Sequence, residues 1–487
     1  MTEPFATERL SRKARVAFGI ATAAGRVYWA ARVLARQLKG RRPASIRRIL
    51  VARRARLGDT VVLLPALVAL RARYPQAYIV LAVQPGSPAA SIVEAERCVD
   101  EVRVVDFLLR PTLAARVLGA IRLWLEGFDA LVTGTSTFLL REVFYCGALY
   151  RAGADDGHPL HRLLNRRHPF DAGRHEAETN LETVALLGAR AVGAVRVPRI
   201  ACVPGSQRVD DALRAAVGIP VHASLVIAHA GAQKPSRRWP AAHFALLIER
   251  ILRTRPDVHV ALSGVGDERD VVDAVCAALP ADVRDRAHDL VGRTDLNGLT
   301  ALARGCSAFI VNDTGIMHLV RAAGAPLVAL LGPENPLRWG PHPWGGAPAV
   351  SLRVRVPCAP CKRWSCAFHA CMTCLTVDDV AEEVFALLDT TRPAGAGTDA
   401  AEALHGLRVR ETALTWSQVA ETRLPPLVSI VVPAGDGLDE RLDAVRRQDY
   451  PRIEAVVVER GQTASYTGRL PGVGALRVVR AGPADDV

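Results

Sequence analysis

Short, mostly apolar runs followed by longer segments of helical periodicity recur from residue 46 to residue 388. The apolar runs have the length of buried strands, and strands that alternate with helices build parallel sheets. The series breaks at Pro204-Gly205-Ser206 and then resumes. We therefore predict an α/β protein with two Rossmann-like domains, residues 46–203 and 204–388, that face each other across a cleft. The expected strands are 49–52, 78–83, 101–105 and 130–133 in the first domain and 225–229, 259–263, 309–311 and 327–331 in the second.

Length and charge narrow the class of protein. A chain of 487 residues suits two or three domains, and no apolar run reaches the roughly 18 uncharged residues of a membrane-spanning helix. The net charge is +13, and the first 50 residues contribute +10 of it. An enzyme that acts on nucleic acid carries its positive charge around a groove rather than in one terminal arm. We therefore expect no nucleic-acid partner.

Residues 1–45 form a basic arm with the pattern of an amphipathic helix. Its apolar side contains Val16, Ile20 and Val27, and Arg15, Arg26, Arg32, Arg36 and Lys39 fall on the other side. Such a helix can lie on an anionic bilayer, which predicts a cytoplasmic protein that is peripheral on the inner face of the membrane. A helix packed on the next domain, a partly disordered leader and a cleaved signal peptide are the alternatives.

The stretch 309–318 predicts a strand, a tight turn and the start of a helix. Asp313 or Thr314 can cap this helix, and Gly315 lets a ligand approach the backbone. The amides of a first helical turn and the positive end of the helix dipole suit a diphosphate. His318 would lie one turn further and face the same crevice. An ordinary strand-to-helix corner with a core histidine would also give this pattern.

Charged residues follow other strands at the same predicted edge. Asp59 comes after the first strand of the first domain, and Lys234 and Arg237 follow the first strand of the second. A carboxylate can deprotonate an acceptor hydroxyl, while cations offset the charge on a leaving diphosphate. Glu268, after a glycine turn, could bind ribose hydroxyls. The region has no DxD-like metal pair, so we expect transfer from a nucleotide-activated donor with cations in place of a metal.

Four segments together resemble glycosyltransferase family 9, the ADP-heptose:lipopolysaccharide heptosyltransferases. They are residues 56–67, which contain Asp59, then 237–240, 313–318 and Gly332-Pro333. The resemblance covers residues 46–388 and implies a GT-B fold, inversion at the anomeric carbon and no metal requirement. By position it implies that Asp59 is the general base. It likewise implies that Asp313, Thr314, Gly315 and His318 form the donor-binding turn, with Arg237 where many members have Lys.

The resemblance implies a transferase of lipopolysaccharide biosynthesis in the cell envelope. It would move a heptose or related sugar from a nucleoside diphosphate sugar, ADP-heptose, to a lipopolysaccharide-core or similar lipid-linked acceptor without a cofactor. Arg53, Arg54 and Arg56 either bind an anionic acceptor or are solvated loop charges. The alternative function is an inactive sugar-nucleotide-binding or scaffold protein at the membrane. The retained Asp59 argues against that alternative.

Five cysteines gather within seventeen residues before the last helix of the second domain. They are Cys358, Cys361, Cys366, Cys371 and Cys374, with His369 among them. So many thiolates suit a structural zinc or a cluster, and disulfides are the alternative. We expect a structural staple rather than a catalytic centre, and a reducing compartment favours the metal.

Beyond residue 388 the composition changes to Thr, Pro, Ala and Gly, which predicts a linker over 389–424. Residues 425–487 then resemble the opening of a glycosyltransferase family 2 domain, which implies a partial GT-A fold. The expected elements are a strand at 427–432, a helix at 439–447 and a strand at 453–458. Glu459-Arg460-Gly461 stands where that family usually has Asp-Asp-Gly. We therefore expect a truncated or degenerate segment that cannot act alone.

Overall fold

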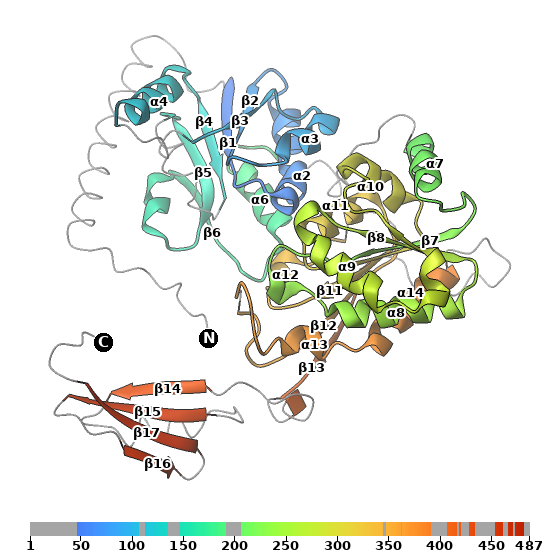
Figure 1. Ribbon diagram of the computed structural model, residues 1–487. Coiled ribbons are helices and arrows are strands. Elements are labelled where there is room, and N and C mark those ends of the chain that lie inside the picture. The colour runs from blue at the N-terminus through green and yellow to red at the C-terminus, as the bar shows by residue number, and fades with distance from the viewer. Residues whose placement is uncertain are drawn as a thin grey trace, which may run out of the picture.

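The structure is a computed structural model, and it contains two α/β domains and a small third sheet (Figure 1). It describes residues 46–106, 113–134, 146–190, 206–343, 347–361, 363–390, 407–415 and 418–419, and four strands between 428 and 481. The predicted arm over 1–45 and the predicted helix at 439–447 lie outside the described residues. Among the described helices, none is both long enough and apolar enough to cross a membrane.

The first domain has a six-stranded parallel sheet with the order β3-β2-β1-β4-β5-β6. All four predicted strands are present, and β5 and β6 are additional. The strands are β1 (Arg48–Ala52), β2 (Tyr78–Val83), β3 (Glu101–Val104), β4 (Ala130–Thr133), β5 (Tyr150–Asp155) and β6 (Arg166–Pro169). The helices are α2 (Leu57–Arg73), α3 (Ala89–Val93), α4 (Leu113–Leu125) and α6 (Glu176–Ala185).

The second domain has a seven-stranded parallel sheet with the order β13-β12-β11-β10-β7-β8-β9. Its strands are β7 (Ser224–His229), β8 (Val258–Ser263), β9 (Ala287–Asp289), β10 (Ala308–Asn312), β11 (Leu327–Leu331), β12 (Ala349–Arg355) and β13 (Leu407–Ala413). Its helices are α7 (Ser206–Ala216), α8 (Ala241–Thr254), α9 (Arg269–Ala278), α10 (Leu296–Arg304), α11 (Gly315–Ala323), α12 (Pro336–Trp339), α13 (Ala370–Thr373) and α14 (Val377–Thr390).

The expected linker over 389–424 is wrong in one part, because it contains strand β13. This strand pairs with β12 from Leu407 to Ala413 and forms the edge of the second sheet. Its side chains are mostly exposed, and its charged residues make ion pairs such as Arg410–Asp379 at 3.0 Å. A half-exposed edge strand lacks the continuous apolar run of the inner strands, so composition did not reveal it.

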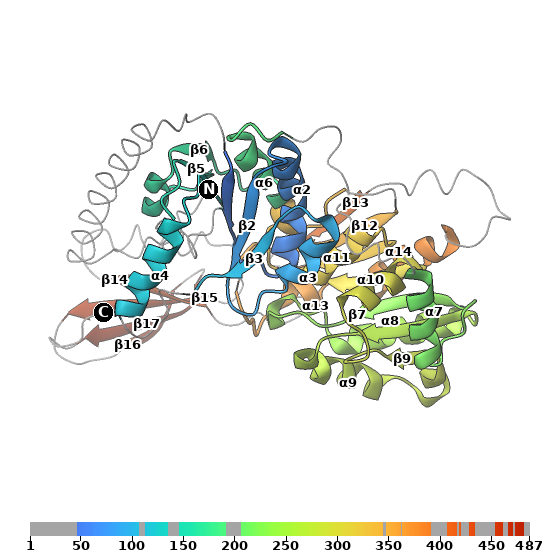
Figure 2. The ribbon, with the colours of Figure 1, turned by 90° about the horizontal axis from the view of Figure 1, so that it is seen from above.

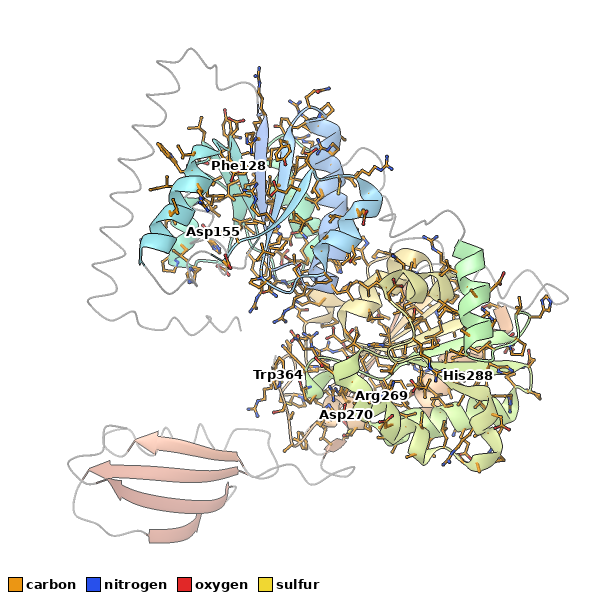
Figure 3. All side chains as sticks on the ribbon, turned by 45° about the horizontal axis from the view of Figure 1, so that its top comes forward. Phe128, Asp155, Arg269, Asp270, His288 and Trp364 are labelled. Atoms are coloured by element: carbon orange, nitrogen blue, oxygen red, sulfur yellow. The ribbon has the colours of Figure 1, made fainter. Side chains whose placement is uncertain are left out.

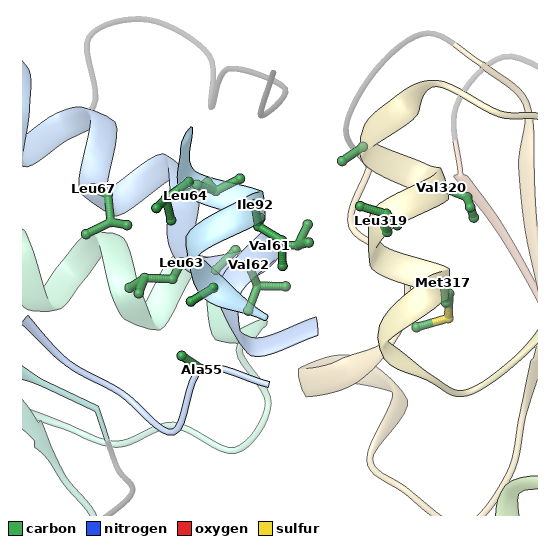
Figure 4. Packing of buried hydrophobic residues seen from close by; sticks show 14 of the residues in the cluster. Ala55, Val61, Val62, Leu63, Leu64, Leu67, Ile92, Met317, Leu319 and Val320 are labelled. Atoms are coloured by element: carbon green, nitrogen blue, oxygen red, sulfur yellow. The ribbon is translucent and has the colours of Figure 1, made fainter. Parts of the chain in front are cut away.

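Helices α2 and α11 join the two domains, and both views place them side by side (Figures 1 and 2). Buried residues of both helices belong to one apolar cluster. Figure 4 shows Val61 and Val62 of α2 on one side and Met317, Leu319 and Val320 of α11 on the other. This shared core fixes the first turns of the two helices against each other.

The C-terminal segment forms a four-stranded sheet with the order β14-β15-β17-β16. Strands β14 (Val428–Pro433), β15 (Ile453–Arg460) and β17 (Val473–Ala481) are parallel, and β16 (Tyr466–Leu470) is antiparallel to β17. The two predicted strands are therefore present. The resemblance of this segment to family 2 stays a prediction.

Candidate functional site

The site lies where the first turns of α2 and α11 meet at the carboxyl ends of β1 and β10. A Cβ atom added to Gly315 would lie 2.7 Å from the amide nitrogen of Gly58, and one added to Gly58 would lie 3.0 Å from Cδ2 of His318. A side chain at position 315 would therefore force the two turns apart, whereas one at position 58 would need only a small shift of its neighbours. The positive ends of two helix dipoles converge at this point, which favours negative charge there.

Asp59 lies in the first turn of α2, and the side chain of the helix cap, Arg56, makes no capping hydrogen bond. Helix α2 begins at Leu57, so Asp59 is the third residue of the helix and not its cap. Burial raises the pKa of Asp59, and the negative charge of Glu176 raises it further, while Arg56 and Arg53 act in the opposite direction. Asp59 is thus a carboxyl group that binds a proton more readily than an ordinary aspartate.

The three arginines of the β1–α2 loop have different surroundings. Arg53 is buried, and its Nη2 donates a 2.5 Å hydrogen bond to Asn180 Oδ1. The Nε and Nη1 atoms of Arg53 have no hydrogen-bond partner among the described residues. Arg54 is exposed, and Arg56 is half-buried at the start of α2. Only Arg53 is therefore enclosed in the site beside Asp59.

The stretch 309–318 folds as its sequence predicts, with strand β10 followed by helix α11. Thr314 is the cap, and its hydroxyl accepts a 3.1 Å hydrogen bond from the amide of Ile316. The amide of Met317 donates to the Thr314 carbonyl at 3.1 Å. The amides of Ile316 and Met317 therefore already have hydrogen-bond acceptors within the turn. A phosphate bound here would need side chains for some of its hydrogen bonds.

Those side chains are the cations of the β7–α8 loop. Lys234 Nζ and Arg237 Nη2 each lie 2.6 Å from Oε1 of Glu334, and Arg237 Nη1 donates to the Asp313 carbonyl at 3.1 Å. Burial opposes the charge of Arg237, but Asp313 and Glu334 raise its pKa above the ordinary value. We call Lys234, Arg237, Glu334 and Asp313 the cation cluster. Its two cations are already balanced by two carboxyl groups.

Asp313 and Glu334 titrate differently within the cation cluster. Asp313 is 4% exposed, and burial raises its pKa to about 6, with Glu334 adding to the shift and Arg237 opposing it. Burial also acts to raise the pKa of Glu334, but Arg237 and Lys234 outweigh burial and keep it below its ordinary value. Asp313 is therefore the carboxyl group that most readily gains a proton when a diphosphate adds negative charge.

His318 faces the junction of the two helices, as predicted, but it is also buried, with 4% of its surface exposed. Burial lowers its pKa to about 3, and the charges of His175, Arg237 and His342 act in the same direction. Its Nδ1 has no hydrogen-bond partner among the described residues. His318 is therefore a neutral ring that has one nitrogen for a ligand hydrogen bond.

Glu268 ends a single turn of 3-10 helix after β8, and its carboxylate lies against the backbone of Gly231. A Cβ atom at Gly231 would come within 2.2 Å of the carboxyl carbon. Oε2 of Glu268 accepts a 3.1 Å hydrogen bond from the amide of Val265, and His229 Nε2 lies 3.5 Å away. Burial lowers the pKa of His229, so this histidine is neutral. The carboxylate is thus fixed at the end of β7 and β8, where a ribose would be bound.

Sequence reasoning missed three charged residues of this region, Glu334, Glu176 and Arg338. Glu334 directly follows Gly332-Pro333 at the end of β11, so a charge after a buried strand was an available signal. Glu176 and Arg338 come from different domains, and their side chains meet at 2.9 Å. No local pattern indicated that pairing.

The Cys-rich segment packs on the loops that form the cation cluster. The amide of Cys361 donates to the Pro333 carbonyl at 3.0 Å, and His369 Nε2 lies 3.0 Å from the Ser236 carbonyl. Trp364, beside these loops, lies on the outside of the second domain (Figure 3). None of the five cysteines forms a disulfide, and no three metal-binding side chains gather among the described residues. The expected metal or disulfide staple stays a prediction, whereas contact with both loops is observed.

The two facing parallel-sheet domains have the fold of GT-B glycosyltransferases. The structure of an ADP-heptose lipopolysaccharide heptosyltransferase II from Escherichia coli aligns with 71% of this chain and 100% of its own, with a TM-score of 0.56 and 22% identity. A family 9 glycosyl transferase from Veillonella parvula aligns with 71% of this chain and 98% of its own, with a TM-score of 0.57 and 20% identity. At these identities the likeness establishes the fold alone.

Residues 143–371 match the model of glycosyltransferase family 9 (heptosyltransferase), so the chain contains a domain of this family. Lipooligosaccharide heptosyltransferase 2 of Haemophilus influenzae is 37% identical over 102 residues, which is 21% of this chain and 29% of that protein. Lipopolysaccharide heptosyltransferase 2 of Escherichia coli is 33% identical over 102 residues, again 29% of its length. The chain thus matches less than a third of the length of these relatives.

Proposed function

We propose that the protein is an inverting, metal-independent glycosyltransferase. It moves a heptose or related sugar from a nucleoside diphosphate sugar, ADP-heptose, to a lipopolysaccharide-core or similar lipid-linked acceptor. The names of the matched relatives support heptose, and the cation cluster supports a diphosphate leaving group. The proposal places the protein at the cytoplasmic face of the membrane, with the basic arm over 1–45 as the membrane contact.

One observation supports this function most strongly, namely the close packing of the first turns of α2 and α11. Asp59 lies in the first turn of α2, and a Cβ atom added to Gly315 of α11 would lie 2.7 Å from the amide nitrogen of Gly58. Arg237 donates to the carbonyl of Asp313, two residues before Gly315, at 3.1 Å, so the proposed base and a phosphate-binding cation lie at adjoining turns of the two domains. Transfer between two substrates requires this arrangement, because the acceptor hydroxyl and the leaving diphosphate lie on opposite sides of the anomeric carbon.

In the proposed reaction, Asp59 removes the proton of the acceptor hydroxyl as its oxygen attacks the anomeric carbon. The bond between this carbon and the diphosphate oxygen breaks, and the diphosphate leaves with the electron pair. Lys234 and Arg237 offset the growing negative charge, and the converging helix dipoles add to this effect. The raised pKa of Asp59 suits a general base, because a more basic carboxylate accepts a proton more readily.

Other residues have supporting parts in the proposal. Glu268 binds the ribose hydroxyls of the donor, and His318 contacts the donor through its ring. Thr314 and Gly315 shape the diphosphate site, and Arg53 binds an anionic group of the acceptor. Arg54 and Arg56 flank the acceptor side, where their charges attract an anionic glycan.

The test is transfer from ADP-heptose to a truncated lipopolysaccharide acceptor, followed by mass spectrometry of the product. We expect Asp59→Asn to lower turnover by about 10²–10⁴-fold, the usual contribution of a general base. Binding of ADP, measured by calorimetry, should persist because the cation cluster is intact. Asp378→Asn, at an exposed ion pair with Arg250, is the matched control and should transfer normally. Undiminished turnover of Asp59→Asn would exclude this function.

The same assay distinguishes this enzyme from the alternative function, an inactive sugar-nucleotide-binding or scaffold protein. That protein would bind ADP-heptose and produce no glycosylated acceptor in the wild-type form. The observation against it is Asp59, which is held in the site with the raised pKa of a base.

A further inference from the structure

Helix α4 is apolar on its outer side as well as on the side that packs against the sheet. Its inner side is marked by Leu123, which is buried and belongs to one apolar cluster with Phe128. Its outer side has four large apolar residues at helical spacing, which we call the α4 stripe: Leu118, Ile121, Trp124 and Leu125. Their exposed fractions are 48%, 45%, 39% and 69%. A helix that is apolar on both sides is usually buried on both, so the stripe indicates a surface that a partner covers.

The α4 stripe is a concentration of apolar surface and not a scatter of single side chains. Of the twelve large apolar side chains that are exposed among the described residues, four belong to this one helix. Each of the other eight lies on a different strand, helix or loop. Helix α4 lies on the outside of the first domain, on the side away from the second domain (Figures 1 and 2). The junction of the two domains therefore does not cover it.

Helix α4 carries only positive charge. Its sequence contains Arg116 and Arg122 and no acidic residue, and Arg122 is exposed. The first acidic residue after its end, Glu126, is paired with Arg48 at 3.3 Å. An apolar stripe with cations beside it fits the surface of an anionic bilayer, where the apolar side chains enter the acyl region and the cations meet the headgroup phosphates. Trp124 is of a residue type that is enriched at this boundary.

The basic arm joins the folded chain close to the end of α4. The backbone amides of Arg47 and Arg48, at the start of β1, donate to Oδ2 of Asp129 at 2.8 and 3.0 Å. Asp129 comes four residues after Leu125, the last residue of α4. Residues 1–45 contain ten Lys or Arg and two Glu, so their net charge is +8. Like charges on the arm and on α4 disfavour the arm as the cover of the stripe, whereas an anionic lipid surface attracts both.

We propose that the α4 stripe is a membrane contact of the folded first domain and inserts into a bilayer that contains anionic phospholipid. This contact is additional to the basic arm of the proposed function, and it does not depend on sugar transfer. Because α4 is packed on the sheet, its insertion would hold the whole domain in one orientation on the lipid surface. The same domain contains Asp59 and Arg53, and the proposed acceptor is anchored in the same bilayer by its lipid.

The test is flotation of the full-length protein with increasing amounts of lipid vesicles, which gives a binding constant. The vesicles contain phosphatidylcholine and phosphatidylglycerol, or phosphatidylcholine alone as the uncharged comparison. We expect the wild type to bind the anionic vesicles more tightly. The triple variant Leu118→Gln/Ile121→Gln/Leu125→Gln should bind them about 10- to 100-fold more weakly, because three partly exposed aliphatic side chains no longer leave water for the acyl region.

A matched triple variant in the second domain controls for the loss of exposed apolar side chains. It is Val221→Gln/Leu246→Gln/Val409→Gln, at positions that are 50%, 54% and 67% exposed, and it should bind vesicles as the wild type does. Thermal unfolding of both triple variants should stay close to that of the wild type, because every changed side chain is exposed.

A charge reversal tests the same surface without changing the stripe, and it covers loss of folding in the α4 triple variant. Arg122→Glu should weaken binding to anionic vesicles by about fivefold or more and leave binding to uncharged vesicles nearly unchanged. Arg250→Glu, at an exposed arginine of the second domain, is its control and should have little effect. Equal weakening by both charge reversals would contradict a specific contact through α4.

Equal binding by the wild type and the α4 triple variant would overturn the inference. Stronger binding by the triple variant would overturn it too, because the basic arm would then be the cover of the stripe. A wild-type dimer that the triple variant converts to a monomer in sedimentation without vesicles would instead identify an interface between copies. If the wild type binds vesicles through α4 but transfers no heptose, the proposed function fails and the inference stands. If Asp59→Asn abolishes transfer and the α4 triple variant binds vesicles normally, only the inference fails.

Discussion

Asp313 allows a quantitative test of the electrostatics of the cation cluster. Its folded-state pKa of about 6 lies above the ordinary value of 3.8, mainly because burial penalises the charged form. The difference of about two units corresponds to about 3 kcal/mol at 1.36 kcal/mol per unit. Since the folded pKa is raised, this cost is absent below pH 4, grows between pH 4 and 6 and is complete above pH 6.

Asp313→Asn removes the ionisation and retains an oxygen that can accept from Arg237. We expect the free energy of unfolding of the variant minus that of the wild type to be about 2–3 kcal/mol larger at pH 8 than at pH 4, because only the wild type carries the buried charge at pH 8. Urea unfolding at the two pH values measures this difference. Any pH-independent effect of the substitution cancels, because both measurements contain it. The control is Asp378→Asn, whose side chain is 81% exposed and whose substitution should give a difference near zero.

A difference near zero for Asp313→Asn would refute the reasoning. It would mean that Arg237 and Lys234 compensate fully for the burial of the charge. A change of sign would mean that ionised Asp313 stabilises the fold, so that the pKa of Asp313 lies below its ordinary value rather than above it.

Two further predictions concern the same site. Glu334→Gln should strengthen ADP binding by about tenfold or more, because a carboxylate about 5 Å from a phosphate costs up to about 3 kcal/mol at an effective dielectric constant of 20. Calorimetry measures the affinity for ADP, and Glu249→Gln, at the ion pair with Arg253, is the control. Unchanged or weaker ADP binding by Glu334→Gln would contradict the expected repulsion between Glu334 and the phosphates. Gly315→Ala should lower stability by about 1–3 kcal/mol and reduce transfer, because its Cβ would lie 2.7 Å from the Gly58 amide. Gly58→Ala, with nearest contacts of 3.0 and 3.1 Å, should cost less in thermal unfolding; the reverse order would contradict the close approach of α2 and α11.

The sequence by itself determined the local structure of both domains. The apolar runs specified the inner strands, and the change from apolar to polar residues at 309–318 specified strand β10 and the start of α11. The sequence left Asp313 and Thr314 as candidates for the cap, and the structure identifies Thr314. These features depend on neighbours within a few residues, so periodicity and capping chemistry are enough to predict them. The sequence did not predict the edge strand β13, because one side of an edge strand is unpaired and its side chains face water, so its residues form no apolar run.

Only the tertiary structure decided which charges meet. Glu334 lies 2.6 Å from Lys234, one hundred residues away in the chain, and Arg338 binds Glu176 of the other domain. The order of the strands and the packing of α2 on α11 create these neighbours, and no local pattern encodes either. Burial then sets the protonation of Asp59, Asp313 and His318, because the cost of a charge depends on what surrounds it. The residue types came from the sequence, and their partners and charge states came from the fold.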